Sequence, residues 1–233
     1  MIPLRDENPT STIPYVVYAL IIINAIVFIY NGTLDPRVYN PLAGLELVPA
    51  ELTTGRDVGP PTLVSPWVTI FTSMFMHANL LHIGGNLLYL WIFGNNIEDV
   101  LGHVKFLLFY LAAGGAAALA QVVVAPYSQI PMVGASGAIA GVLGAYLLLF
   151  PRARIITLLF LFVFIQVVAL PASVVLGFWI ALQVINSLVF ASGTTPGGGV
   201  AYAAHIGGFI AGAVMIYILG GRRLIGNRRS REW

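Results

Sequence analysis

The residues from Gly134 to Gly141 read GASGAIAG, a stretch in which six of the eight positions are Gly or Ala. The stretch continues into the apolar run VLGAYLLLF, and Gly137 and Gly141 form the G-x-x-x-G pattern that lets two membrane helices approach closely. On this pattern alone, Ser136 is one more small residue on a smooth helix face. The nucleophile elbow of soluble hydrolases, G-x-S-x-G, does not fit, because Ala138 stands at its last position. The stretch predicts a close contact between helices, and the role of Ser136 depends on the rest of the chain.

The composition of the 233-residue chain is that of an integral membrane protein. Hydrophobic residues make up 58% of the chain and charged residues only 9%, whereas a soluble domain carries about 25% charged residues. The chain has no Cys, which excludes disulfides, a Cys nucleophile and Cys-based metal sites. We expect the basic residues to mark the orientation of the chain in a bilayer, and we expect no nucleic-acid partner.

Six apolar segments approach the length of about 20 residues that a membrane-spanning helix needs. The segments cover residues 13–30, 79–93, 106–125, 134–150, 171–191 and 201–219. The apolar segment 155–170 is a seventh candidate. The positive-inside rule favours six spans, since a seventh would place the five C-terminal Arg residues on the outer side.

With six spans and the N-terminus inside, nine of the eleven basic residues lie inside, and only Arg37 and Arg56 lie outside. The sequence thus predicts an all-α polytopic membrane protein, a six-helix bundle with both termini in the cytoplasm. Segment 155–170 is then expected at the cytoplasmic interface or packed under the bundle. The basic residues expected inside are Arg5, Lys105, Arg152, Arg154, Arg222, Arg223, Arg228, Arg229 and Arg231.

We expect a single membrane domain over residues 1–233. Residues 1–12 would form a cytoplasmic N-terminal segment and residues 221–233 a basic cytoplasmic tail that faces anionic lipid. A long outer loop, residues 31–77, separates the first two helices and contains six Pro. A loop of this length is usually functional, and a plain tether is the alternative.

Polar and ionisable side chains inside spanning helices are costly and mark functional sites, and the predicted helices contain few of them. The second helix has His82 and Asn86, the fourth begins with Ser136, and the sixth has His205. Since these three helices run in the same direction, His82, Ser136 and His205 are expected at similar depth near the outer face. Asn79 is expected to cap the second helix, and the spacing of His82 and Asn86 places both on one helix face.

This set of side chains is suited to acyl transfer. The small residues of the fourth and sixth helices would let the Ser136 hydroxyl reach the His205 imidazole, which could then act as a general base. His82, Asn86 and the Ser136 amide could donate hydrogen bonds to the oxyanion of the intermediate. Because no Asp or Glu lies in a predicted span, the machinery is expected to be a dyad. The sequence does not identify the group that sets the His205 tautomer.

Two other kinds of site fit less well. A metal site made of His77, His82 and His205 would have no carboxylate or Cys ligand beside them, so we expect no metal and no cofactor. A small transporter usually has charges or broken helices at the middle of the membrane, and no buried charge is expected in this chain.

Several motifs together resemble the rhomboid family of intramembrane serine proteases, and its prokaryotic members in particular. The resemblance extends over nearly the whole chain, with the motifs in the family's order and on the expected helices. The matching pieces are HANLLHIGGN (77–86), GNNIEDVLG (94–102), GASGAIAG (134–141) and AHIGGFIAG (204–212), with IPLRDENPT (2–10) and PRARI (151–155).

The resemblance implies that Ser136 is the nucleophile and His205 the general base. It places His82 and Asn86 in the oxyanion hole with the Ser136 amide, and it implies a structural role for Glu98. The chain is therefore expected to be a serine endopeptidase of the rhomboid type.

One departure from the family concerns the residue that stacks on the catalytic His. Some members carry a Tyr one turn after the nucleophile, whereas this chain has Ala140. We expect His205 to be oriented by Phe209 or by an aromatic side chain from a neighbouring helix. His77 resembles a residue that braces the outer loop.

The implied activity is the cleavage of single-span membrane proteins near the outer face of the membrane. A spanning helix satisfies its own backbone hydrogen bonds, so a substrate must unwind locally before attack. Segment 171–191 lacks a G-x-x-x-G ribbon and is a candidate for a loosely packed lateral gate.

The expected partners are such single-span substrates and the lipid bilayer, and the oligomeric state is left open. The expected location is the plasma (inner) membrane of a prokaryote. The alternatives are a catalytically inactive rhomboid-like binding or chaperone protein and a small transporter.

Overall fold

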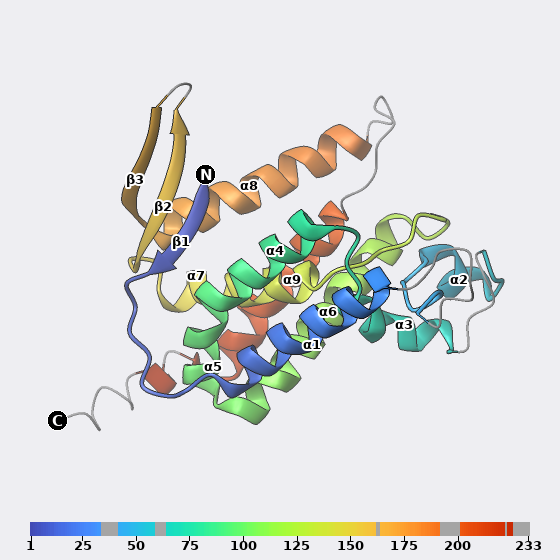
Figure 1. Cartoon of the computed structure of the whole chain (residues 1–233), viewed down its shortest axis with the longest axis horizontal. Coiled ribbons are helices and arrows are strands. Elements are labelled where there is room, and N and C mark those ends of the chain that lie inside the picture. The colour runs from blue at the N-terminus through green and yellow to red at the C-terminus, as the bar shows by residue number, and fades with distance from the viewer. Residues whose placement is uncertain (34–41, 59–63, 162–163, 192–200, 222, 226–233) are drawn as a thin grey trace.

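The computed structural model shows a bundle of apolar helices with a small β-sheet beside one end (Figure 1). The residues that it describes are 1–33, 42–58, 64–161, 164–191, 201–221 and 223–225. The main helices are α1 (Tyr15–Thr33), α4 (Leu80–Tyr89), α5 (Asn95–Leu101), α6 (His103–Val124), α7 (Ser136–Leu149), α8 (Ala172–Ala191) and α9 (Tyr202–Ile218). Short helices in the segment between α1 and α4 are α2 (Pro49–Thr54), α3 (Pro66–Thr72) and a 3₁₀ turn (Ser73–Phe75).

Three of the expected segments lie partly outside the described residues. They are the basic tail, of which residues 222 and 226–233 are not described, the outer loop, of which residues 34–41 and 59–63 are not described, and segment 155–170, of which residues 162–163 are not described. The described part of the outer loop contains short helices and pairs with the chain just before α7. Leu47 and Met132 exchange both backbone hydrogen bonds, at 3.1 and 2.7 Å.

The second expected helix is longer than its apolar segment. A π-helical turn, Leu90–Gly94, joins α4 to α5 without a break, since Leu90 and Asn95 both keep right-handed helical dihedrals. The helix therefore continues to Leu101 rather than ending near residue 93. At its start, the Asn79 side chain accepts a hydrogen bond of 2.9 Å from the His82 amide, which confirms the predicted N-cap.

Three helices in the described part of the chain are long and apolar enough to cross a membrane. They are α1, α6 and the part of α8 from Ala172 to Val189. The apolar helices α7 and α9 are shorter, with 14 and 17 residues, and α7 lies inside the bundle. Because α7 has side chains such as Val142, Leu143 and Tyr146 with no exposed surface, the bundle is built around it.

Glycines bring α7 and α9 into backbone contact. A Cβ atom on Gly208 would overlap the carbonyl oxygen of Gly137, and one on Gly212 would overlap that of Gly141. The close helix contact that the GASGAIAG stretch predicts is confirmed on two sides: its backbone carbonyls touch α9, and a Cβ on Gly137 or Gly141 would meet a side chain of α6. Small residues permit this approach because they leave no side chain between the two backbones.

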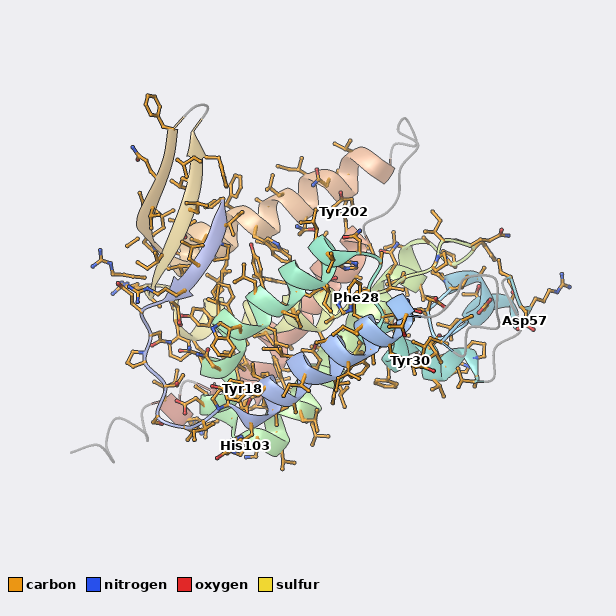
Figure 2. The ribbon with its side chains drawn as sticks, in the orientation of Figure 1. Tyr18, Phe28, Tyr30, Asp57, His103 and Tyr202 are labelled. Atoms are coloured by element: carbon orange, nitrogen blue, oxygen red, sulfur yellow. The ribbon has the colours of Figure 1, made fainter. Side chains whose placement is uncertain are left out.

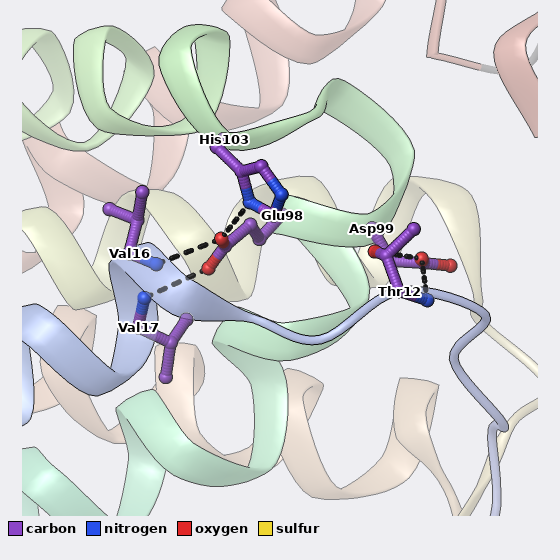
Figure 3. A network of polar contacts seen from close by, with 6 residues as sticks. All are labelled: Thr12, Val16, Val17, Glu98, Asp99 and His103. Carbon is purple, nitrogen blue, oxygen red and sulfur yellow. Dashed lines mark hydrogen bonds and ion pairs between the residues drawn. The ribbon is translucent and has the colours of Figure 1, made fainter.

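Two carboxylates of α5 hold the N-terminal segment against the bundle (Figure 3). Glu98 accepts hydrogen bonds from the amides of Val16 and Val17, at 2.9 and 2.8 Å, and thereby satisfies two unpaired amides at the start of α1. Its Oε1 atom also lies 2.5 Å from Nδ1 of His103. Asp99 accepts a hydrogen bond of 2.9 Å from the Thr12 amide. The contacts of Glu98 are those of the structural acid that the rhomboid resemblance implies.

The expectation of an all-α fold is wrong in one region. Segment 155–170 forms an antiparallel hairpin, β2 (Arg154–Leu161) and β3 (Phe164–Pro171), and β1 (Ile2–Asp6) pairs with β2 to give the order β1-β2-β3. The hairpin is rich in β-branched and aromatic residues, which favour strands. Residues 2–6 of the N-terminal segment are thus one strand of this sheet.

We predict that closing the gap between α7 and α9 destabilises the bundle. The Gly212→Ala variant should lose roughly 1–3 kcal/mol of unfolding free energy, because its Cβ would be forced against backbone that cannot move aside. The measurement is unfolding of the purified protein in detergent. Gly177→Ala in α8 is the matched control, since a Cβ there meets no atom within 4 Å; a control that loses as much would contradict the packing argument.

Asp6 is a partly buried carboxylate that ties the sheet to the bundle. Its Oδ2 atom accepts hydrogen bonds from the Tyr146 hydroxyl at 2.7 Å and from Asn96 Nδ2 at 3.0 Å, and Asn96 in turn accepts one from Asn8. Burial raises the pKa of Asp6 above its ordinary value, and the hydrogen bonds from Tyr146 and Asn96 only partly offset that effect. The folded protein therefore holds the Asp6 proton more tightly than the unfolded chain.

We predict that this carboxylate costs stability at neutral pH. The sign follows from linkage. The contribution of the protonated Asp6 carboxyl group to folding stability is fully present below its unfolded pKa of about 3.9, and it is lost as the pH rises through its higher pKa in the folded protein. Asp6→Asn keeps an acceptor oxygen but no charge, so it should melt higher than the parent protein at pH 7 and lose that advantage below about pH 4. Asp57→Asn, at an exposed position, is the control. An Asp6→Asn difference that is the same at every pH would contradict the prediction.

Candidate active site

The Ser136 hydroxyl and the His205 imidazole lie in hydrogen-bond contact, with 2.7 Å between Oγ and Nε2. Ser136 is the first residue of α7, and His205 lies in the first turn of α9. Tyr202, which opens α9, lies toward the opposite end of the bundle from His103, which opens α6 (Figure 2). The glycine contact between α7 and α9 brings the two starting turns together. His205 is buried, with 9% of its surface exposed.

The turn at Gly134 lies next to His82 and Asn86, close to Ser136. Gly134 has φ +115°, a conformation that suits Gly, and it turns the chain into α7. A Cβ atom on Gly134 would lie 2.6 Å from His82 Nε2 and 3.5 Å from Asn86 Nδ2. Both side chains of α4 therefore face the backbone two residues before Ser136.

Two unused donors point to this region. Asn86 is buried, and among the described residues its Nδ2 atom has no hydrogen-bond partner. Ser136 is the first residue of its helix, so its amide is among the four that a helix leaves without an internal acceptor. The structure thus brings together the four side chains singled out in the sequence, and the roles expected for them stay predictions.

The His77 imidazole packs edge-on against the His82 ring, with 5.2 Å between the ring centroids. His77 is buried and lies three residues before α4, where its ring contacts the His82 side chain from the side of the outer loop. In the described residues, no group of three or more His, Cys, Asp or Glu side chains is arranged to hold a metal ion. The structure therefore offers no metal site built from His77, His82 and His205.

Gln183 of α8 is the site residue that the sequence analysis missed. Its Oε1 atom lies 2.8 Å from His205 Nδ1, on the other side of the imidazole from Ser136. Like His205, it is 9% exposed. A signal for it was present, because Gln183 is the only polar residue between Ser173 and Asn186 in an otherwise apolar helix.

Trp179 lies one turn before Gln183 on α8 and contacts the imidazole from the side. The Trp179 and His205 ring centroids are 5.7 Å apart, and Trp179 also stacks near Phe209 at 6.3 Å. An aromatic side chain from a neighbouring helix thus lies beside His205. Position 140, where some family members carry a Tyr that stacks on the catalytic His, is Ala in this chain.

A small cavity of about 40 Å³ lies beside Ser136. Its lining includes Ser73, Gly134, Ser136 and Ala204, from the segment before α4, the turn before α7, α7 and α9. A space of this size can hold a water molecule, which needs only about 10–15 Å³ of such volume, and the hydroxyl side chains in its lining are those of Ser73 and Ser136. The site therefore has room for a hydrolytic water next to the serine hydroxyl.

Comparison with known proteins agrees with the motifs. Residues 65–222 match the Rhomboid domain. The chain belongs to the rhomboid family. It is 31% identical over 203 residues to Rhomboid protein 1, mitochondrial, of Saccharomyces cerevisiae, an alignment that covers 85% of this chain and 51% of that protein.

Two further relatives show the range of the family. The chain is 43% identical over 81 residues to the Rhomboid protease GluP of Bacillus subtilis, covering 35% of this chain and 15% of that protein. It is 32% identical over 161 residues to the human Presenilin-associated rhomboid-like protein, mitochondrial, covering 68% of this chain and 39% of that protein. The chain thus spans about half the length, or less, of these curated relatives.

The expected location in a prokaryotic plasma membrane is wrong by this comparison. Relatives that align with most of this chain are named as mitochondrial, in yeast and mammals, or as chloroplastic, in Arabidopsis thaliana. The bacterial relative aligns with only 35% of it. Motifs such as IPLRDENPT led to the prokaryotic expectation, but short motifs that position the N-terminal segment do not identify a compartment.

Proposed function

We propose that the protein is an intramembrane serine endopeptidase in which Ser136 is the nucleophile and His205 the general base. The observation that carries this proposal is the 2.7 Å contact between Ser136 Oγ and His205 Nε2, in a buried site beside a cavity that can hold water. A serine hydroxyl within about 2.6–3.2 Å of an imidazole is the arrangement that activates a nucleophile.

The proposed reaction proceeds through an acyl-enzyme. Ser136 Oγ attacks the carbonyl carbon of the scissile peptide while its proton passes to His205 Nε2. As the C–N bond breaks, the imidazolium returns that proton to the leaving amine. A water molecule then attacks the acyl-enzyme and gives its proton to Nε2, and collapse of this second intermediate releases the acid and restores the Ser136 hydroxyl.

The negative oxygen that forms in both steps needs hydrogen-bond donors already in place. The Ser136 amide, Asn86 Nδ2 and His82 Nε2 are the candidates, since both side chains face Gly134 just before the nucleophile. Placing neutral donors here avoids the cost of a buried charge within the membrane.

We also propose that six helical segments cross the membrane: α1, the continuous α4–α5 helix, α6, α7, α8 and α9. The 14 residues of α7 extend over about 21 Å at 1.5 Å per residue, less than the roughly 30 Å hydrocarbon core. Ser136, at the start of this short helix, would then lie below the membrane surface. The cavity beside it has room for the water that the surrounding lipid excludes.

The proposed substrates are single-span membrane proteins whose helix unwinds near the side of the membrane where Ser136 lies. The outer face of α8 supports entry beside this helix, because it is apolar and exposed at Ile185 and Leu188, with 54% and 69% of their surfaces open. The lipid bilayer is the remaining proposed partner.

Single-Cys variants of this Cys-free chain should report the proposed topology. Asp57→Cys and Tyr127→Cys, at exposed positions, should react with an impermeant maleimide from one side of sealed vesicles. Arg152→Cys, also exposed, should react only from the other side, because α7 separates it from Tyr127. Equal labelling of Tyr127→Cys and Arg152→Cys from one side would contradict the six-segment arrangement.

The catalytic proposal predicts two degrees of loss in cleavage rate among variants, measured in proteoliposomes that contain a single-span substrate. Ser136→Ala and His205→Ala should each abolish cleavage, because either change removes the covalent route. Asn86→Ala should keep a residual rate, lower by roughly 10²–10³, since it removes one oxyanion donor among several. His82→Ala should fall in the same class.

Reaction with a fluorophosphonate, which labels activated serines, is the second readout, and Ser187→Ala in α8 is the control for loss of a membrane hydroxyl. Cleavage by folded Ser136→Ala would contradict the proposal. An unlabelled and inactive parent protein would instead favour the catalytically inactive rhomboid-like alternative.

A further inference from the structure

Gln183 makes a polar contact on the inward side of a helix whose other side is apolar. Its Oε1 atom lies 2.8 Å from His205 Nδ1, while Val184 and Ile185, the next two residues, are 41% and 54% exposed. A buried amide within the membrane is costly unless it is hydrogen-bonded. The placement of Gln183 thus calls for an explanation beyond the packing of α8.

The contact fixes which nitrogen of His205 carries the proton. The carbonyl oxygen of an amide side chain only accepts hydrogen bonds, so the Nδ1 atom that faces it must be the donor. The neutral ring then has its lone pair on Nε2, the atom that faces the Ser136 hydroxyl. In the other tautomer two lone pairs would face each other at Nδ1, and Nε2–H would point at the hydroxyl and could not accept its proton.

We propose that Gln183 is a positioning residue that holds His205 in the tautomer and orientation required of the general base. The proposal rests on the proposed protease function. It assigns to a neutral amide the part that a carboxylate plays in a Ser-His-Asp triad, where the acid orients the imidazole and stabilises its charged form. The amide orients the ring by the same hydrogen bond but contributes no charge.

The surroundings of His205 leave Gln183 as the described group suited to this task. The ionisable group that acts on His205 from another helix is the His82 imidazole of α4. In α8 the sequence contains no ionisable side chain, and in α7 its only one is Tyr146, ten residues after Ser136. In α6 the ionisable residues are His103, Lys105 and Tyr110, all in the half of the helix that begins at the opposite end of the bundle, and α9 itself adds Tyr202 and Tyr217.

The alternative is that the bond only ties α8 to α9. Hydrogen bonds between membrane helices are worth about 0.6 kcal/mol on average, so removal of a purely structural bond would change stability slightly and leave kcat of the folded protein unchanged. A positioning bond predicts a change in kcat with little change in KM, and a different pH profile when the amide becomes a carboxylate.

The test compares kcat, KM and the pH–rate profile of the parent protein, Gln183→Met and Gln183→Glu, with a single-span substrate in proteoliposomes. Gln183→Met fills the same space without an acceptor, and its kcat should fall about tenfold or more. Gln183→Glu keeps the acceptor and adds charge, so it should retain activity while the acid limb of its profile moves up by about one pH unit or more. Gln166→Met, at an exposed position on β3, is the control for the same chemical change outside the site.

The outcomes separate this proposal from the protease function itself. If Ser136→Ala still cleaves, the protease assignment fails. If Ser136→Ala is inactive and Gln183→Glu keeps the parent pH profile, the positioning role is overturned, even where Gln183→Met has lost activity, because the loss then reflects helix packing. If Gln183→Met does not fold, the profile of Gln183→Glu alone decides.

Discussion

The backbone contact between α7 and α9 is the constraint on which the site depends. Lipid offers no hydrophobic force that drives two apolar helices together, so they associate through close packing. Glycines at 144, 208 and 212 let the two backbones touch, because a Cβ on any of them would overlap backbone atoms of the other helix. The distance between Ser136 and His205 follows from that contact, because both residues lie in the first turns of the touching helices. The small residues set the geometry of a chemical site.

The two ends of the bundle use polar groups in different ways. Near the sheet, Glu98 and Asp99 accept hydrogen bonds from backbone amides between Thr12 and Val17, and Asp6 accepts hydrogen bonds from side chains of the bundle. Around Ser136, the described polar side chains are neutral amides, imidazoles and hydroxyls. A charge buried at membrane depth is expensive, whereas a neutral group needs only a partner. The use of Gln183 instead of a carboxylate beside His205 agrees with this division.

Family membership and site geometry support the proposed function in different ways. The Rhomboid domain match over residues 65–222 assigns the family. The relatives of this chain include one named as a protease and one named as rhomboid-like. The local arrangement around Ser136 adds what a family name lacks: a hydroxyl on an imidazole, unused donors facing the same place and a cavity for water. These are the groups that hydrolysis of a peptide bond requires.

The sequence by itself determined the apolar helices, the Asn79 cap, the glycine contact and the grouping of Ser136 with His205, His82 and Asn86. It could do so because apolar length, helix spacing and the rarity of polar residues in membrane helices are local properties. Tertiary structure decided the rest. The β1-β2-β3 sheet joins residues 2–6 to residues 154–171. The sequence of a strand does not indicate which distant segment its backbone pairs with. Gln183 had a local signal, but its partner could be known only once α8 and α9 were placed side by side, because a hydrogen bond depends on position in space rather than on spacing along the chain.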